Sequence, residues 1–149
     1  MATVSGELPS ACLACGGAQG IRDTAGWVCA NCGWRVGDVP DPDLPPVRVE
    51  VVYYLRFRDR IKIGTSGRPR ARLAQLRYEE LLAFERGGRD VEQRRHAQFA
   101  ESRFPGSEWF VSNRALTRHI RAVARGTTDP WAAYARWMAE ELALRVSRG

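Results

Sequence analysis

The chain has 149 residues, of which 44% are hydrophobic and 27% are charged, a composition typical of a soluble globular protein rather than a disordered one. No apolar run approaches the roughly 18 residues of a membrane-spanning helix, so we expect no membrane partner. Residues 47–126 carry a net charge of +9 and residues 1–46 a net charge of −3, which favours a phosphate-backbone partner over a merely solvated basic surface.

Residues 1–9 are expected to be a loose tail, and residues 10–37 are predicted to form a zinc ribbon. The N-terminus lacks the basic start and apolar stretch of a signal peptide, so we expect a cytoplasmic protein with reduced cysteines. A disulfide pair or a redox C-x2-C site is the alternative. Two C-x2-C pairs separated by 13 residues have close to the spacing of a closed, structural four-thiolate Zn²⁺ site. The predicted ligands are Cys12, Cys15, Cys29 and Cys32.

A proline- and aspartate-rich linker, residues 38–46, separates the ribbon from a predicted β-hairpin. Residues 47–57 alternate in the manner of a strand, and residues 60–64 form the second strand after a turn at Arg58-Asp59. An even-numbered loop places Tyr53 opposite Gly64, so Tyr53 shares a face with Lys62. A three-residue loop would shift the parity and bring in Tyr54 instead.

The remaining residues are predicted to form helices and one more strand. Pro69 suits the first turn of a helix that ends near Arg77, and Asp90 is expected to cap a helix that ends near Ser102. The other predicted elements are a strand at 80–87 (a helix is the alternative), a short extended piece after the loop at 104–110, a helix at 112–125 capped by Ser112 or Asn113, and a last helix opening at Asp129-Pro130.

These elements predict an α+β fold with a small, mostly antiparallel three-stranded sheet flanked by helices. The sheet and its helices would form a domain over residues 47–126. Residues 127–149 would form a C-terminal amphipathic helix, with an apolar stripe that includes Trp131.

Several short motifs in residues 47–111 together resemble the GIY-YIG endonuclease superfamily. The strand Val51-Val52-Tyr53-Tyr54-Leu55 stands where the family has its GIY motif, and Lys62-Ile63-Gly64 stands where it has YIG. The spacing E-x3-H-x2-F from Glu92 is similar to that of a branch found in phage and bacterial proteins, which often has lysine in place of the YIG tyrosine. The sequence departs from the family at Val51, which replaces the first glycine, and no asparagine clearly matches the last motif.

The resemblance implies a Mg²⁺-dependent DNA endonuclease. It assigns Glu92 to a single Mg²⁺, Arg72 to the phosphate, and Tyr53 to the general base, acting directly or through water. Lys62 would lower the pKa of Tyr53, and His96 would assist proton transfer or orient Glu92. Glu92 and His96 share one helix face independently of the family, because they are four residues apart.

Basic side chains elsewhere are candidates for tracking DNA phosphates, and two other function classes stay open. The same fold could be a non-catalytic DNA-binding module, or the chain could be an interaction adaptor with Trp131 and Trp137 as anchors. A zinc nucleobase deaminase is disfavoured, because no H-x-E precedes the cysteine pairs. His119 has no evident partner in the sequence. The candidate DNA-binding residues are Arg68, Arg70, Arg114, Arg118 and Arg121, with Arg125 continuing the last stripe.

Overall fold

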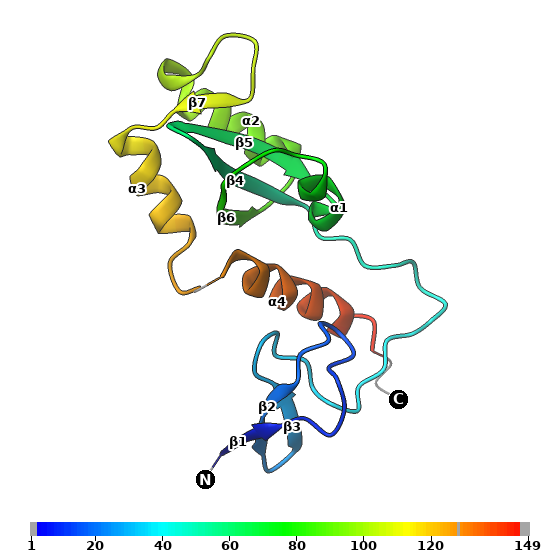
Figure 1. The fold of residues 1–149 in the computed structure, drawn as a ribbon. Coiled ribbons are helices and arrows are strands. Elements are labelled where there is room, and N and C mark those ends of the chain that lie inside the picture. Colours follow the sequence, from blue (N-terminus) through cyan, green and yellow to red (C-terminus); the bar gives the residue numbers. More distant parts are fainter. Residues whose placement is uncertain (1–2, 128, 147–149) are drawn as a thin grey trace. The chain divides into compact units, whose positions relative to one another are not determined.

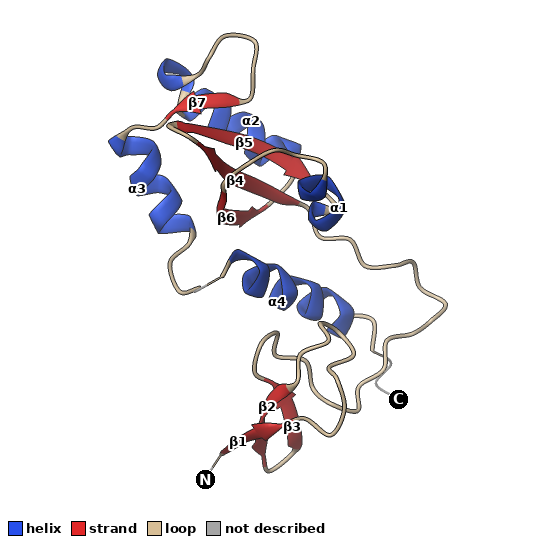
Figure 2. Cartoon of the chain, in the orientation of Figure 1, coloured by secondary structure: helices blue, strands red, loops and turns tan. Residues whose placement is uncertain are grey.

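The computed structural model describes residues 3–127 and 129–146 and is α+β, with two antiparallel sheets (Figures 1 and 2). The chain divides into two compact units. One unit comprises the residues up to Val47 together with those from Trp131 onward, and the other is Arg48–Pro130. Among the helices in the described part, none is both long and apolar enough to span a bilayer.

The first unit contains the cysteines, a small sheet and the last helix. Its sheet has the order β1-β2-β3, with antiparallel pairing throughout. β1 lies within the segment expected to be a loose tail; that expectation is wrong, because residues 4–7 pair with residues 19–22. The elements are β1 (Val4–Glu7), β2 (Gln19–Asp23), β3 (Gly26–Cys29) and α4 (Pro130–Ala143).

The last helix packs on the ribbon. Ala135 and Ala139 belong to one buried cluster with Trp34, Leu8 and three of the cysteines. Backbone pairing between residues 40 and 146 and the hydrogen bond from Asp41 N to Arg145 O (2.8 Å) also join the two segments. A region of about 30 residues has little core of its own, so the helix supplies apolar surface that the ribbon lacks.

The second unit is built on a four-stranded sheet with the order β6-β4-β5-β7. The expected sheet had three strands; the fourth, which pairs with β5 at residues 60–62, begins at Trp109, within the segment 104–110 that was expected to be a loop. The 80–87 segment is a strand, as favoured. The elements are β4 (Val51–Phe57), β5 (Arg60–Ser66), α1 (Pro69–Ala74), β6 (Glu80–Arg86), α2 (Arg89–Gln98), a 3₁₀ turn (Ala100–Ser102), β7 (Trp109–Val111) and α3 (Arg114–Val123).

The hairpin register is as predicted. Tyr53 pairs with Gly64 and Leu55 with Lys62, across a two-residue turn in which Arg58 has a φ of 56°. Because successive residues of a strand face opposite sides of the sheet, Tyr53 and Tyr54 point into different environments.

Helix ends differ from the expectation in three places. α1 is shorter than expected and ends at Ala74. Asp90 is not a cap: the N-cap of α2 is Gly88, and Asp90 lies in the first turn, where a carboxylate still interacts favourably with the helix dipole. α2 ends at Gln98 before the 3₁₀ turn. Asn113 caps α3 by accepting a hydrogen bond from Leu116 N at 2.9 Å.

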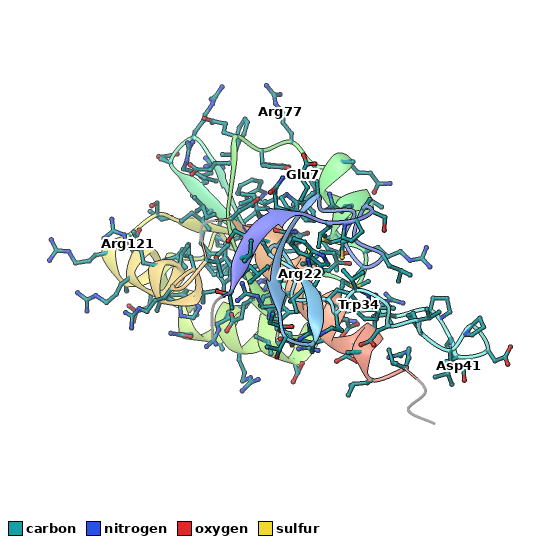
Figure 3. All side chains as sticks on the ribbon, turned by 90° about the horizontal axis from the view of Figure 1, so that it is seen from below. Glu7, Arg22, Trp34, Asp41, Arg77 and Arg121 are labelled. Atoms are coloured by element: carbon teal, nitrogen blue, oxygen red, sulfur yellow. The ribbon has the colours of Figure 1, made fainter. Side chains whose placement is uncertain are left out.

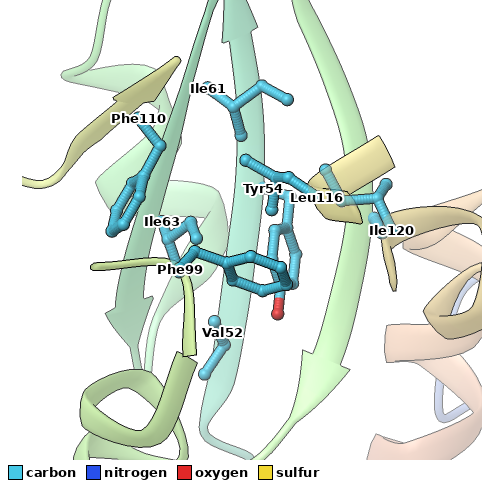
Figure 4. Close-up of a cluster of buried hydrophobic side chains, with 9 residues drawn as sticks. Val52, Tyr54, Ile61, Ile63, Phe99, Phe110, Leu116 and Ile120 are labelled. Atoms are coloured by element: carbon cyan, nitrogen blue, oxygen red, sulfur yellow. The ribbon is translucent and has the colours of Figure 1, made fainter. Parts of the chain in front are cut away.

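The Tyr54 face of the sheet holds the main core of this unit (Figure 4). Side chains from β4, β5, β7, the end of α2 and α3 meet there, and those of Tyr54, Phe110 and Leu116 are fully buried. This face is therefore used for packing. On the opposite face Val51, Tyr53 and Leu55 are also buried, and the exposed residue Arg72 reaches Tyr53 there. The cluster consists of Val52, Tyr54, Ile61, Ile63, Ala83, Phe99, Phe110, Leu116 and Ile120.

Candidate functional site

The four cysteines of the ribbon lie close enough to hold one metal ion. Their sulfur atoms are all within 4.8 Å of one another. The Sγ–Sγ distance is 3.6 Å both for Cys12–Cys32 and for Cys15–Cys29. A tetrahedron with Zn–S bonds of about 2.3 Å has S–S edges of about 3.8 Å, whereas a disulfide requires about 2.05 Å. The donor set and its spacing therefore fit a four-thiolate zinc site.

Polar groups around the cluster favour thiolates. Gly17 N and Asn31 Nδ2 donate to Cys15 Sγ at 3.4 and 3.5 Å. Burial raises the pKa of Cys15, but these hydrogen bonds outweigh it and lower the pKa below its usual value. Burial raises the pKa of Cys29 and of Cys32, so a cation in the cluster is what would keep those two sulfurs ionised.

In the second unit, the ring of Tyr53 lies directly on the backbone of Gly64. A Cβ added at Gly64 would stand 2.4 Å from both Cζ and Oη of Tyr53. Any side chain there would displace the ring, which is 1% exposed. The glycine of the Lys62-Ile63-Gly64 motif thus has a physical reason: it lets the tyrosine lie flat across the neighbouring strand.

Arg72 of α1 holds the hydroxyl of Tyr53 through a side-chain hydrogen bond. Burial raises the pKa of Tyr53 above its usual value, and the interaction with Arg72 only partly offsets that rise. Lys62, which the sequence predicts to lower this pKa, is not among the groups that act most strongly on Tyr53. The cation that acts on Tyr53 is Arg72, and the net shift is upward.

Lys62 instead pairs with Glu108, a residue that the sequence did not single out. The Lys62 Nζ atom is 3.8 Å from Glu108 Oε2 and 5.6 Å from the centre of the Trp109 ring. The charge of Glu108 helps to raise the pKa of both Tyr53 and Glu92. Glu108 lies in the loop before β7, where no periodic pattern predicts the direction of a side chain, so only the fold reveals this second carboxylate.

Glu92 and His96 of α2 both reach the edge of β5. Glu92 is 9% exposed and accepts a hydrogen bond from the backbone N–H of Thr65. His96 Nε2 lies 2.8 Å from the carbonyl oxygen of Ile63; since a carbonyl only accepts, Nε2 carries the proton and Nδ1 is the basic nitrogen. The two residues share a face, as predicted, and they satisfy backbone groups on β5, whose pairing with β7 involves only residues 60–62.

Burial first, and then the charge of Glu108, raises the pKa of Glu92. His96 and Arg89 oppose the shift without cancelling it. Glu92 is thus a buried carboxylate with uncompensated negative charge around it, which a divalent cation would relieve. Mg²⁺ commonly binds through one or two carboxylates, with water and phosphate completing its shell, and Glu92 offers one such carboxylate.

Tyr54, the alternative to Tyr53, belongs to a different network. Its hydroxyl donates to Glu85 Oε1 at 2.7 Å and lies 3.0 Å from His119 Nε2. Arg95 Nε also donates to Glu85, at 3.0 Å. These contacts connect β4, β6, α2 and α3 on the packed face and give His119 the partners that the sequence did not show. Arg72, in contrast, hydrogen-bonds to Tyr53.

The candidate DNA-binding arginines form two separate groups. Arg68 and Arg70 are exposed on or beside α1, next to the Tyr53 face. On α3, which packs against the opposite face, Arg114, Arg118 and Arg121 line a shallow pocket of about 450 Å³ together with Thr117. Figure 3 shows the side chain of Arg121 extending outward from α3. The two groups lie on elements that cover opposite faces, so they do not form one continuous stripe.

The model of one known family matches most of the second unit. The model of the T5orf172 domain matches residues 50–125, about half of the chain. The chain belongs to the T5orf172 domain family. This family is nuclease-associated, and its match covers Tyr53, Lys62, Arg72, Glu92 and His96. No curated protein and no solved structure matches the chain.

Proposed function

We propose that the T5orf172 domain of this chain is a metal-dependent DNA endonuclease that hydrolyses phosphodiester bonds. The observation that supports this most is the convergence of Tyr53, Arg72 and Glu92. Arg72 is hydrogen-bonded to the Tyr53 hydroxyl, and the negative charge of Glu92 contributes to the raised pKa of that hydroxyl. A tyrosine and an exposed arginine thus meet beside β5, whose edge the buried carboxylate of Glu92 reaches from α2.

The residues divide the work of hydrolysis as follows. Arg72 grips phosphate oxygens in bidentate fashion, because its planar guanidinium matches them. Tyr53 keeps its proton at neutral pH and orients the attacking water. His96 presents Nδ1 as a proton acceptor. Lys62 balances the charge of Glu108. Glu92 would hold Mg²⁺, which when bound stabilises charge on the phosphate and the leaving oxygen.

The deciding experiment is cleavage of supercoiled plasmid with Mg²⁺. Glu92→Gln removes the negative charge but keeps an oxygen that can accept the hydrogen bond from Thr65 N–H. It therefore tests metal binding while that backbone N–H stays hydrogen-bonded. Arg72→Ala tests the phosphate contact. Glu101→Gln and Arg136→Ala change exposed residues of the same types elsewhere and serve as matched controls, with the zinc content of every variant measured.

We expect the wild type and both controls to cut, and Glu92→Gln and Arg72→Ala to lose about 100-fold or more, the size of effect that follows the removal of one preorganised electrostatic group. An inert wild type that binds DNA in a salt-dependent way would make the domain a binding module instead. A wild type that neither cuts nor binds DNA would favour the interaction adaptor.

A further inference from the structure

Two aromatic rings lie at the tip of the β4–β5 hairpin, on the same sheet face as Tyr53. Phe57 is four residues from Tyr53 on one strand, and Trp109 pairs with Lys62 across β5 and β7. Their ring centres are 6.4 Å apart in an edge-to-face arrangement. Both rings are half-buried, so this end of the face presents aromatic surface to solvent.

Exposed arginines lie over the ring of Phe57 and over that of Phe104. The guanidinium carbons of Arg58 and Arg77 lie 5.5 and 5.3 Å from the centre of Phe57. Arg60 stands 4.5 Å from the centre of the nearby Phe104 ring, and Figure 3 shows Arg77 extending outward. We call Phe57, Trp109, Arg58, Arg60 and Arg77 the hairpin-tip platform.

A pocket lies at the hairpin-tip platform. Phe57, Arg58, Asp59, Arg60 and Trp109 line a pocket of about 420 Å³, a size within the range of small-ligand clefts, about 300–1,000 Å³. If the hairpin tip served only for packing, its aromatic side chains would be fully buried and several arginines would not lie around them. Guanidinium groups over half-buried aromatic rings are instead a combination that can bind a phosphate next to a stacked base.

We propose that the hairpin-tip platform binds unpaired nucleotides, so that the enzyme prefers gapped, branched or single-stranded DNA to an intact duplex. A base can stack on Trp109 or Phe57 only if it is unpaired, because a duplex hides its base faces. The arginines then contact the flanking phosphates. This inference rests on the proposed nuclease function, and it names the class of substrate: the platform continues along the face that holds Lys62 and Tyr53.

The test is equilibrium binding of labelled DNA by the full chain in the Glu92→Gln background, where no cleavage is required. A duplex is compared with the same duplex carrying a four-nucleotide gap, at one salt concentration. Trp109→Leu removes the ring and keeps apolar bulk, Trp109→Phe keeps a ring, and Arg136→Ala is the charge control. Thermal melting of each variant verifies that it folds.

We expect the parent to bind gapped DNA about tenfold more tightly than duplex, since stacking of one base is worth roughly 1–3 kcal/mol, or about 5–150-fold. Trp109→Leu should lose this preference while its duplex affinity stays within about twofold, and Trp109→Phe should retain most of it. Equal affinity of the parent for both DNAs, or equal weakening of both by Trp109→Leu, overturns the platform. If the wild type cuts plasmid but the parent shows no preference for gapped DNA, only the platform proposal is refuted. If the parent prefers gapped DNA but the wild type never cuts, only the proposed nuclease activity is refuted.

Discussion

Replacing Gly64 by alanine tests the close contact between the ring of Tyr53 and the backbone of the neighbouring strand. The added Cβ would stand 2.4 Å from Tyr53 Cζ and Oη, more than 1 Å inside the optimal separation of about 3.5–4.0 Å. The ring is 1% exposed and has no free space to enter. Overpacking of this kind costs about 1–3 kcal/mol, which lowers the Tm by roughly 5–20 °C for a domain of this size.

Gly6→Ala is the matched control, because a Cβ at this strand glycine would meet its nearest atom, on Trp27, at an ordinary 3.4 Å. Thermal melts should therefore show a large loss for Gly64→Ala and a small change for Gly6→Ala. In a Tyr53→Leu background, Gly64→Ala should cost much less, since the clashing ring is gone. Equal costs in the two backgrounds, or a cost at Gly64 no larger than at Gly6, would refute the steric explanation.

Three further predictions concern charge and metal. Glu92→Gln should raise the Tm at pH 7, because the raised pKa of Glu92 means that ionisation opposes folding; the gain should vanish at a pH below about 4, where glutamate is protonated in both states. Removal of zinc by a chelator, or Cys15→Ser, should expose Trp34, now 3% exposed, and shift tryptophan emission to the red, with recovery only when zinc is returned to the wild type. Glu85→Gln should cost about 2–3 kcal/mol in urea unfolding, because Arg95 loses its charged acceptor; the pKa of Glu85 is lowered, so the advantage of the wild type should shrink as pH falls through that lowered value.

Patterns within a few residues were enough to predict much of this fold. The alternation of residues 51–57 predicts the strand, and the parity of a two-residue turn predicts that Tyr53 faces Gly64. The four-residue spacing of Glu92 and His96 predicts their shared face. Each of these inferences uses a fixed local geometry, so no tertiary information is needed.

Contacts between distant segments could not be predicted in the same way. Nothing near Glu108 in the sequence indicates that its carboxylate meets Lys62, and nothing near His119 indicates Tyr54 and Glu85. The sequence likewise does not show that α1 brings Arg72 to the hydroxyl of Tyr53.

The two adjacent tyrosines of β4 have different partners on the two faces of the sheet. Tyr54 donates to Glu85 at 2.7 Å in a network that also contains Arg95 of α2. Arg95 lies one turn from Glu92 on the same helix, so the network on the packed face fixes the helix that carries the candidate metal ligand. Tyr53, one residue earlier, then meets Arg72 on the other face. A change at Glu85 should therefore weaken cleavage through the position of Glu92, even though Glu85 touches none of the groups assigned to the reaction.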